Sequence, residues 1–109
     1  MMRLTTIAFA AALAVPMFAS AAPSQAQRDF VNYLIKSGDE PKVKDATWMT
    51  DRNLYVGVID DSTRRDGFAD YICMVAADHG FKPEMVKVID VVKVVQTGKF
   101  TELGKAYCR

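Results

Sequence analysis

Two cysteines constrain the fold more than any other feature of this sequence. Cys73 lies in the second half of the chain, Cys108 is the penultimate residue, and there is no third cysteine. In an oxidising compartment, an even number of cysteines with none left over favours a disulfide. A Cys73–Cys108 bond would stabilise a small fold by about 3–4 kcal/mol. We therefore expect this bond, which would tie the C-terminus to the middle of the chain.

The N-terminus predicts export. Arg3 precedes an uncharged apolar run from Leu4 to Phe18, and small residues follow up to Ala21. This layout is typical of a secretory signal peptide, and the run is shorter than the roughly 20 apolar residues that cross a bilayer. We expect residues 1–21 to be a signal peptide and residues 22–109 to form one small domain. We expect it in the periplasm rather than the extracellular medium, without membrane association in its mature form.

The charge balance argues against one class of partner. Without Arg3 the chain carries 13 basic and 13 acidic side chains. A net charge near zero disfavours binding to nucleic acid through bulk electrostatics, so no nucleic-acid partner is expected. Half of the residues are hydrophobic, which suits a folded domain rather than a disordered chain.

The first half of the domain predicts a helix followed by a hairpin. Ser24 and Gln27 form a capping-box pattern, apolar residues then recur at helical spacing, and Gly38 marks the expected helix end. Two stretches with strand character, Val43–Met49 and Leu54–Ile59, flank a polar turn. In the second stretch Leu54, Val56 and Val58 share one face, while Tyr55, Gly57 and Ile59 share the other.

The second half predicts a helix and two strands. An apolar stripe from Phe68 to His79 predicts a helix from about Thr63 to His79, and we expect its regular part to begin at Asp66 after an irregular first turn. The valine-rich segment Val86–Val95 predicts a strand with a bulge or bend at Val91-Val92, and Phe100–Tyr107 predicts a return strand. Gly104 suggests a further irregularity in that strand.

The order of elements is therefore α-β-β-α-β-β, which predicts an α+β fold. Each helix has one apolar stripe that needs a sheet, and a strand–helix–strand crossover places its helix on one face. We expect a two-layer sandwich in which both helices cover the same face of a mainly antiparallel sheet.

The uncovered face of that sheet is the first candidate binding surface. Tyr55, Ile59 and Ile89 would point away from the helices, and an apolar surface of this kind often marks an interaction site. The competing interpretation is that a loop or the tail of the chain covers it. The side of the sheet that Trp48 occupies is left open.

The segment from Asp60 to Asp70 offers a second candidate. Arg64 and Arg65 stand between a strand and a helix, where free backbone amides and guanidinium groups can bind an anion. The competing interpretation is that both arginines pair with the neighbouring aspartates. A calcium loop is not expected, because the position of one of its oxygen ligands is taken by Arg64.

The sequence offers little support for a catalytic site. His79 is the only histidine and is expected to cap a helix end, while Asp60 and Asp61 are neighbours that usually point apart. We therefore expect a small, exported, disulfide-bridged binding or adaptor protein that uses the outer sheet face for an envelope protein partner or a homodimer. Alternatives are a small anionic-ligand binder using Arg64 and Arg65, and an enzyme. No catalytic residue, metal or cofactor is expected.

Overall fold

The computed structural model describes residues 22–36 and 42–109. The predicted signal peptide (residues 1–21) and the predicted helix end at Gly38 lie outside the described residues. The described chain forms, in order, α2 (Gln25–Lys36), β1 (Asp45–Trp48), β2 (Asn53–Val58), α3 (Asp66–Asp78), β3 (Met85–Asp90), α4 (Val91–Thr97) and β4 (Glu102–Tyr107).

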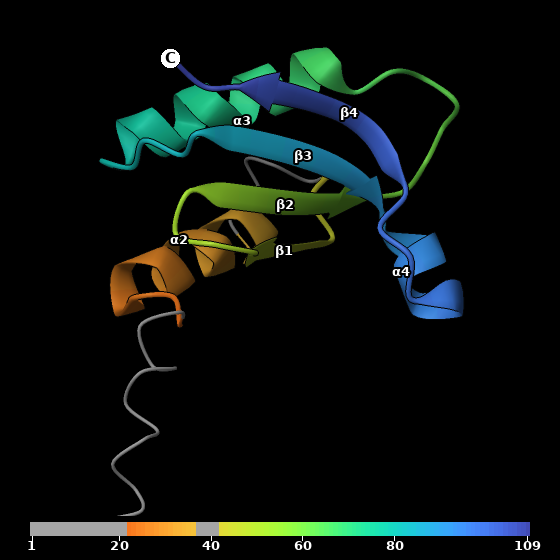
Figure 1. Ribbon diagram of the computed structural model, residues 1–109, viewed down its shortest axis with the longest axis horizontal. Coiled ribbons are helices and arrows are strands. Elements are labelled where there is room, and N and C mark those ends of the chain that lie inside the picture. Colours follow the sequence, from red (N-terminus) through yellow and green to blue (C-terminus); the bar gives the residue numbers. More distant parts are fainter. Residues whose placement is uncertain (1–21, 37–41) are drawn as a thin grey trace, which may run out of the picture.

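The four strands form one sheet in the order β1-β2-β3-β4. The pairs β1/β2 and β3/β4 are antiparallel, whereas β2 and β3, which α3 connects, are parallel. Figure 1 shows α3 on the far side of β3 and β4, and α2 next to β1. The predicted α+β class, with helices packed on a mostly antiparallel sheet, is confirmed.

Local signals determine how α2 and α3 begin and end. The capping box at α2 is present: the Gln27 N–H donates to the Ser24 Oγ (3.0 Å) and the Ser24 N–H donates to the Gln27 Oε1 (2.9 Å). The regular helix α3 starts at Asp66, as predicted. Beyond its end, Gly80 has a φ of 86°, a left-handed conformation that glycine adopts without steric cost.

One apolar core lies between the sheet and the two helices. Leu54, Val56 and Val58 are fully buried, which confirms the predicted inward face of β2. Phe30 and Leu34 from α2 belong to the same core. Trp48 joins it from β1, where its indole N–H donates to the Gln27 carbonyl (3.1 Å), and this settles which side of the sheet it occupies.

The prediction of one long strand from Val86 to Val95 is wrong. β3 ends at Asp90, and Val91–Thr97 forms α4 instead of continuing the strand through a bulge. The Asp90 carboxylate accepts hydrogen bonds from the Val92 and Lys93 N–H groups (3.0 and 3.2 Å), and Gly98 ends the helix with a φ of 76°. An N-cap and a C-terminal glycine therefore outweigh the strand preference of four valines.

β4 is clamped against the start of α3. The Arg65 N–H donates to the Leu103 carbonyl (3.0 Å), and the Lys105 N–H donates to the Asp66 Oδ1 (2.8 Å). The pairing of β3 with β4 shifts register next to Gly104, so the predicted irregularity is present there. These contacts occupy the Leu103 carbonyl and the Lys105 N–H on the outer edge of β4.

The expected disulfide joins Cys73 on α3 to Cys108, directly after β4, with Cα atoms 5.4 Å apart. The bond fixes the end of the chain to the helix layer and is consistent with an oxidising compartment. Among the described residues, no helix is long and apolar enough to span a membrane.

Candidate functional site

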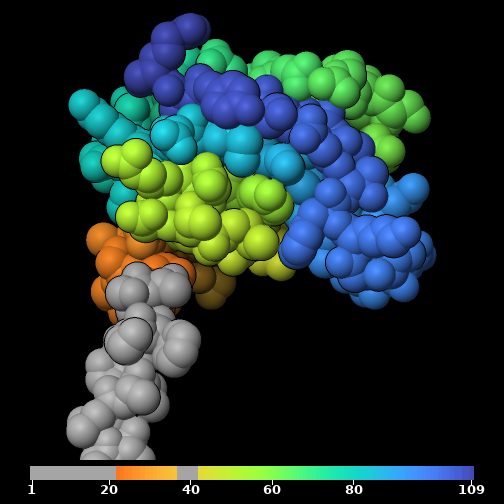
Figure 2. Space-filling model, viewed as in Figure 1, coloured from red at the N-terminus to blue at the C-terminus, as the bar shows by residue number. Residues whose placement is uncertain are grey.

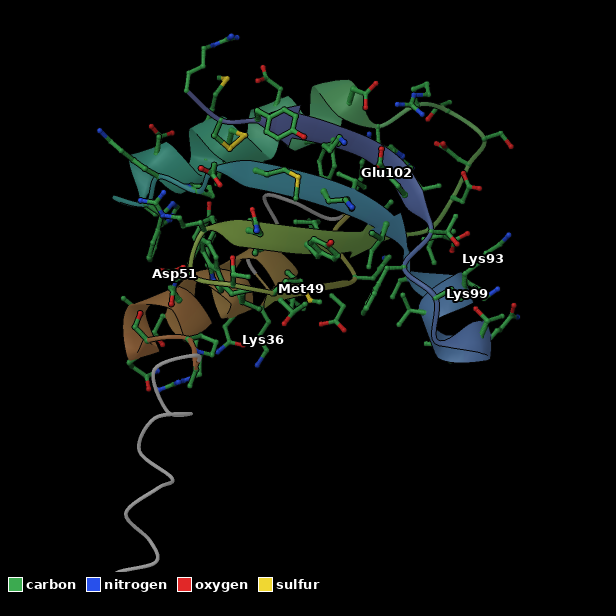
Figure 3. The ribbon with its side chains drawn as sticks, viewed as in Figure 1. Lys36, Met49, Asp51, Lys93, Lys99 and Glu102 are labelled. Carbon is green, nitrogen blue, oxygen red and sulfur yellow. A yellow bond between two sulfur atoms is a disulfide. The ribbon has the colours of Figure 1, made fainter. Side chains whose placement is uncertain are left out.

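The face of the sheet opposite α2 and α3 carries no helix over most of its strands (Figure 1). The pairing registers place Thr47, Tyr55, Lys87 and Lys105 in one row across all four strands, and Asn53, Met85 and Tyr107 in the next. In Figure 2 this face is turned to the reader, and β2, β3 and β4 carry no helix over their centres. Met49 and Glu102 are labelled on it in Figure 3.

Two tyrosine rings on this face each lie close to a lysine. The Lys87 Nζ lies 5.1 Å from the centre of the Tyr55 ring, and the Lys105 Nζ lies 5.5 Å from that of Tyr107. The Phe100 ring meets Tyr55 edge-on at 5.7 Å. We call Tyr55, Lys87, Phe100, Lys105 and Tyr107 the outer-face patch. Tyr107 is 65% exposed and Phe100 is 47% exposed, so a partner could reach both rings.

α4 covers one end of this face. Ile89 points outward as predicted but is only 5% exposed, so it offers a partner almost no surface. A Cβ placed on Gly57 would lie 3.1 Å from the Val91 Cβ, which shows how closely α4 packs here. The competing interpretation, that another part of the chain covers this face, is therefore correct only for the end of the sheet near Gly57 and Ile89.

A small apolar pocket remains between α4 and β1. It is lined by Asp45, Ala46, Thr47, Tyr55, Gly57, Ile89, Val91, Val94 and Phe100. The structure therefore brings Tyr55 and Ile89 together around one pocket. It does not bring Ile59 there: Ile59 follows the end of β2, is 49% exposed, and lines a different hollow beside Arg65.

Sequence reasoning missed Phe100, Lys105 and Tyr107. Lys105 and Tyr107 alternate within the predicted return strand, but strict alternation would place Phe100 on the opposite face, and the face that each occupies depends on the register with β3. A register shift at Gly104 decides that register, and no local pattern reports its direction.

The two arginines of the predicted anion site do not share a ligand cradle. Arg64 is exposed, and its guanidinium forms a close ion pair with Asp66 (2.8 Å). Arg65 is buried; its Nη2 donates to the Ile59 carbonyl (3.1 Å) and lies 3.3 Å from the Asp61 Oδ1. Both arginines thus pair with neighbouring aspartates, which was the competing interpretation.

These contacts shift the titration of both aspartates. The pKa of Asp66 is lowered, first by the hydrogen bond from Arg64 and then by that from the Lys105 N–H. The pKa of Asp61 is lowered chiefly by the Thr63 hydroxyl, which donates to its carboxylate (2.6 Å). Charge-assisted hydrogen bonds favour the ionised carboxylate in both cases.

Asp66→Asn is expected to weaken the dependence of stability on acid pH. A carboxyl whose pKa is lowered by folding stabilises the fold at pH values above its ordinary pKa of 3.8 and loses this contribution as the pH falls through the folded pKa. Urea denaturation between about pH 5 and pH 2 measures the loss. The wild type should lose more free energy of unfolding than the variant; equal losses would contradict the assignment.

His79 occupies a structural position. It is the C-cap residue of α3, and its Nδ1 lies 3.0 Å from the Val75 carbonyl. Its ring packs against Phe30 and Tyr33, with ring centres 5.2 and 4.4 Å away. Within residues 22–36 and 42–109, no group of three or more histidine, cysteine or acidic side chains is arranged to hold a metal ion.

Comparison of the chain with protein-family models, with curated proteins and with solved structures finds no match. The geometry described above is therefore the basis for the functional proposal.

Proposed function

We propose that this chain is a small exported binding protein that docks a protein partner on the outer-face patch. The observation that carries the proposal is the exposure of Tyr107 and Phe100 on a sheet face that α2 and α3 leave uncovered. Aromatic side chains are enriched at protein interfaces and supply much of their binding energy, because they bury a large area with few rotatable bonds.

The charges on the patch indicate the partner's chemistry. The Lys87 Nζ lies 3.7 Å from the Glu102 Oε1. Lys105 forms no such ion pair with a described residue. A complementary surface would therefore place carboxylates around an apolar centre. A second copy of the chain fits less well, since a two-fold interface would bring the same lysines close to one another.

The small pocket beside Tyr55 supplies a specific anchor point. Its walls are mostly apolar, with Gly57 and Ile89 from the sheet and Val91 from α4. A single apolar side chain of the partner inserted there would be desolvated at the centre of the interface, which is where binding energy concentrates. In this proposal the chain binds and does not catalyse.

Tyr107→Glu is expected to reduce capture of the partner at least about tenfold, because it replaces the most exposed ring of the patch by a charge. The oxidised mature chain would be immobilised and exposed to an envelope extract. The matched control is Met74→Glu, which alters a residue with 59% exposure on α3, in the opposite layer.

Three outcomes decide the proposal. Loss of capture in Tyr107→Glu with retention in Met74→Glu supports it. Unchanged capture in Tyr107→Glu and in Tyr55→Glu overturns it. Light scattering of the purified protein tests which molecule occupies the patch. If the protein is a dimer that Tyr107→Glu dissociates, the occupant is a second copy of the chain and not a different protein.

A further inference from the structure

A second surface, separate from the outer-face patch, borders a buried guanidinium group that has one unsatisfied donor. Arg65 is 6% exposed, and its buried Nε has no hydrogen-bond acceptor within the part of the chain that the structure describes. Among the described residues, its guanidinium pairs with one carboxylate, that of Asp61, whose side chain is 58% exposed. A buried donor without a partner costs free energy, so this N–H group favours a ligand that supplies an acceptor.

The guanidinium borders a hollow that is rich in positive charge. The hollow has a volume of about 330 Å³ and is lined by Lys42, Lys44, Val58, Ile59, Asp61 and Arg65. It lies where β1 begins beside the end of β2, and the Lys44 N–H donates to the Gly57 carbonyl (2.9 Å). Three cationic side chains thus face one carboxylate.

The single carboxylate neutralises this charge only in part. Asp61 is engaged first by Thr63, whose hydroxyl and N–H both donate to its Oδ1 (2.6 and 3.1 Å). Lys42 and Lys44 form no ion pair with any described residue, and the Lys42 Nζ lies 5.8 Å from the centre of the Phe68 ring. Among the described residues, the lining of the hollow therefore carries three cationic side chains and one carboxylate.

We propose that this hollow binds a small oxyanion of the phosphate type, held by Lys42, Lys44 and Arg65. Phosphate oxygens accept hydrogen bonds from guanidinium and ammonium groups, and a double negative charge matches the surplus of two positive charges in the hollow. Arg64 takes no part, because Asp66 occupies its guanidinium. The predicted pair Arg64 and Arg65 is thus replaced by Arg65 with two lysines from the segment before β1.

Inorganic phosphate is the probe, and the rise in melting temperature of the purified oxidised chain is the readout. Phosphate should stabilise the wild type more than sodium chloride does at the same ionic strength. The double change Lys42→Gln/Lys44→Gln should weaken phosphate binding at least about tenfold, since two charged donors are removed. These are exposed side chains before β1, so the variant should still fold.

Two further variants sharpen the test. Arg64→Gln removes one positive charge nearby, against two in the lysine variant, and should change phosphate affinity less than about twofold, because the charge it removes is already paired. Asp61→Asn removes the competing carboxylate and should raise the affinity. Sulfate and acetate test whether the site selects phosphate chemistry or any anion.

The proposal is overturned if phosphate stabilises the wild type no more than chloride does. It is also overturned if Arg64→Gln loses as much affinity as Lys42→Gln/Lys44→Gln, since bulk charge would then explain binding. Both readouts use the purified chain alone, so they are independent of whether the outer-face patch has a protein partner.

Discussion

Gly104→Ala is expected to destabilise the protein by about 3 kcal/mol or more. A Cβ at this position would overlap the backbone of Arg65 and Asp66, and its distance to the Arg65 carbonyl oxygen would be only 2.6 Å. Backbone atoms cannot rotate away as a side chain can, so the start of α3 would have to separate from β4. Urea denaturation followed by circular dichroism measures the change.

The same experiment has a matched control in Gly67→Ala. Gly67 lies in the first turn of α3, and a Cβ there would meet nothing within 4 Å. Alanine is favoured over glycine inside a helix, so this variant should gain about 0.5–1 kcal/mol. Equal effects of the two substitutions would contradict the proposed clamp between α3 and β4.

Loss of the Cys73–Cys108 disulfide is expected to cost about 3–4 kcal/mol of the free energy of unfolding. The bond closes a loop with a sequence separation of 35 residues, and in the chain-entropy model it acts by restricting the unfolded chain. For so small a domain this is a large share of the total stability. Denaturation with and without a reductant measures it.

Cys73→Ala/Cys108→Ala separates the bond from side effects of the reductant. The variant should match the reduced wild type in stability, and the reductant should not change it further. A variant as stable as the oxidised wild type would contradict the assigned role of the disulfide.

The predictions from sequence succeeded where the determinants are local. The capping box of Ser24 and Gln27 involves residues three positions apart, and the inward face of β2 follows from strict alternation over six residues. The start of α3 at Asp66 could also be predicted, because two arginines disfavour an earlier start in a helix whose N-terminus is positive.

The valine-rich segment shows why other predictions failed. β-branched residues favour strands, yet Asp90 and Gly98 stand at the two ends of a possible short helix. In α4 no residue is buried, and Val95 is 82% exposed. The helix is therefore selected by its caps and by the packing of Val91 on Gly57, a contact between residues 34 positions apart.

The candidate sites divide in the same way. The outer face could be predicted from alternation, and Tyr55 lies on it. The burial of Ile89 could not, because it depends on α4 folding back over the sheet. Likewise, nothing local distinguishes Arg64 from Arg65, but Arg65 becomes buried because its backbone is held against β4.

The sequence alone determined which residues form α2, the hairpin and α3, and which two cysteines pair, since these follow from periodicity, caps and the count of a residue type. The tertiary structure alone decided the register of β4, the covering of one end of the sheet by α4, and the meeting of Arg65 with Lys42 and Lys44. The physical reason is range: hydrogen bonds within one turn are set by near neighbours, whereas burial and register are set by packing between segments far apart in the chain.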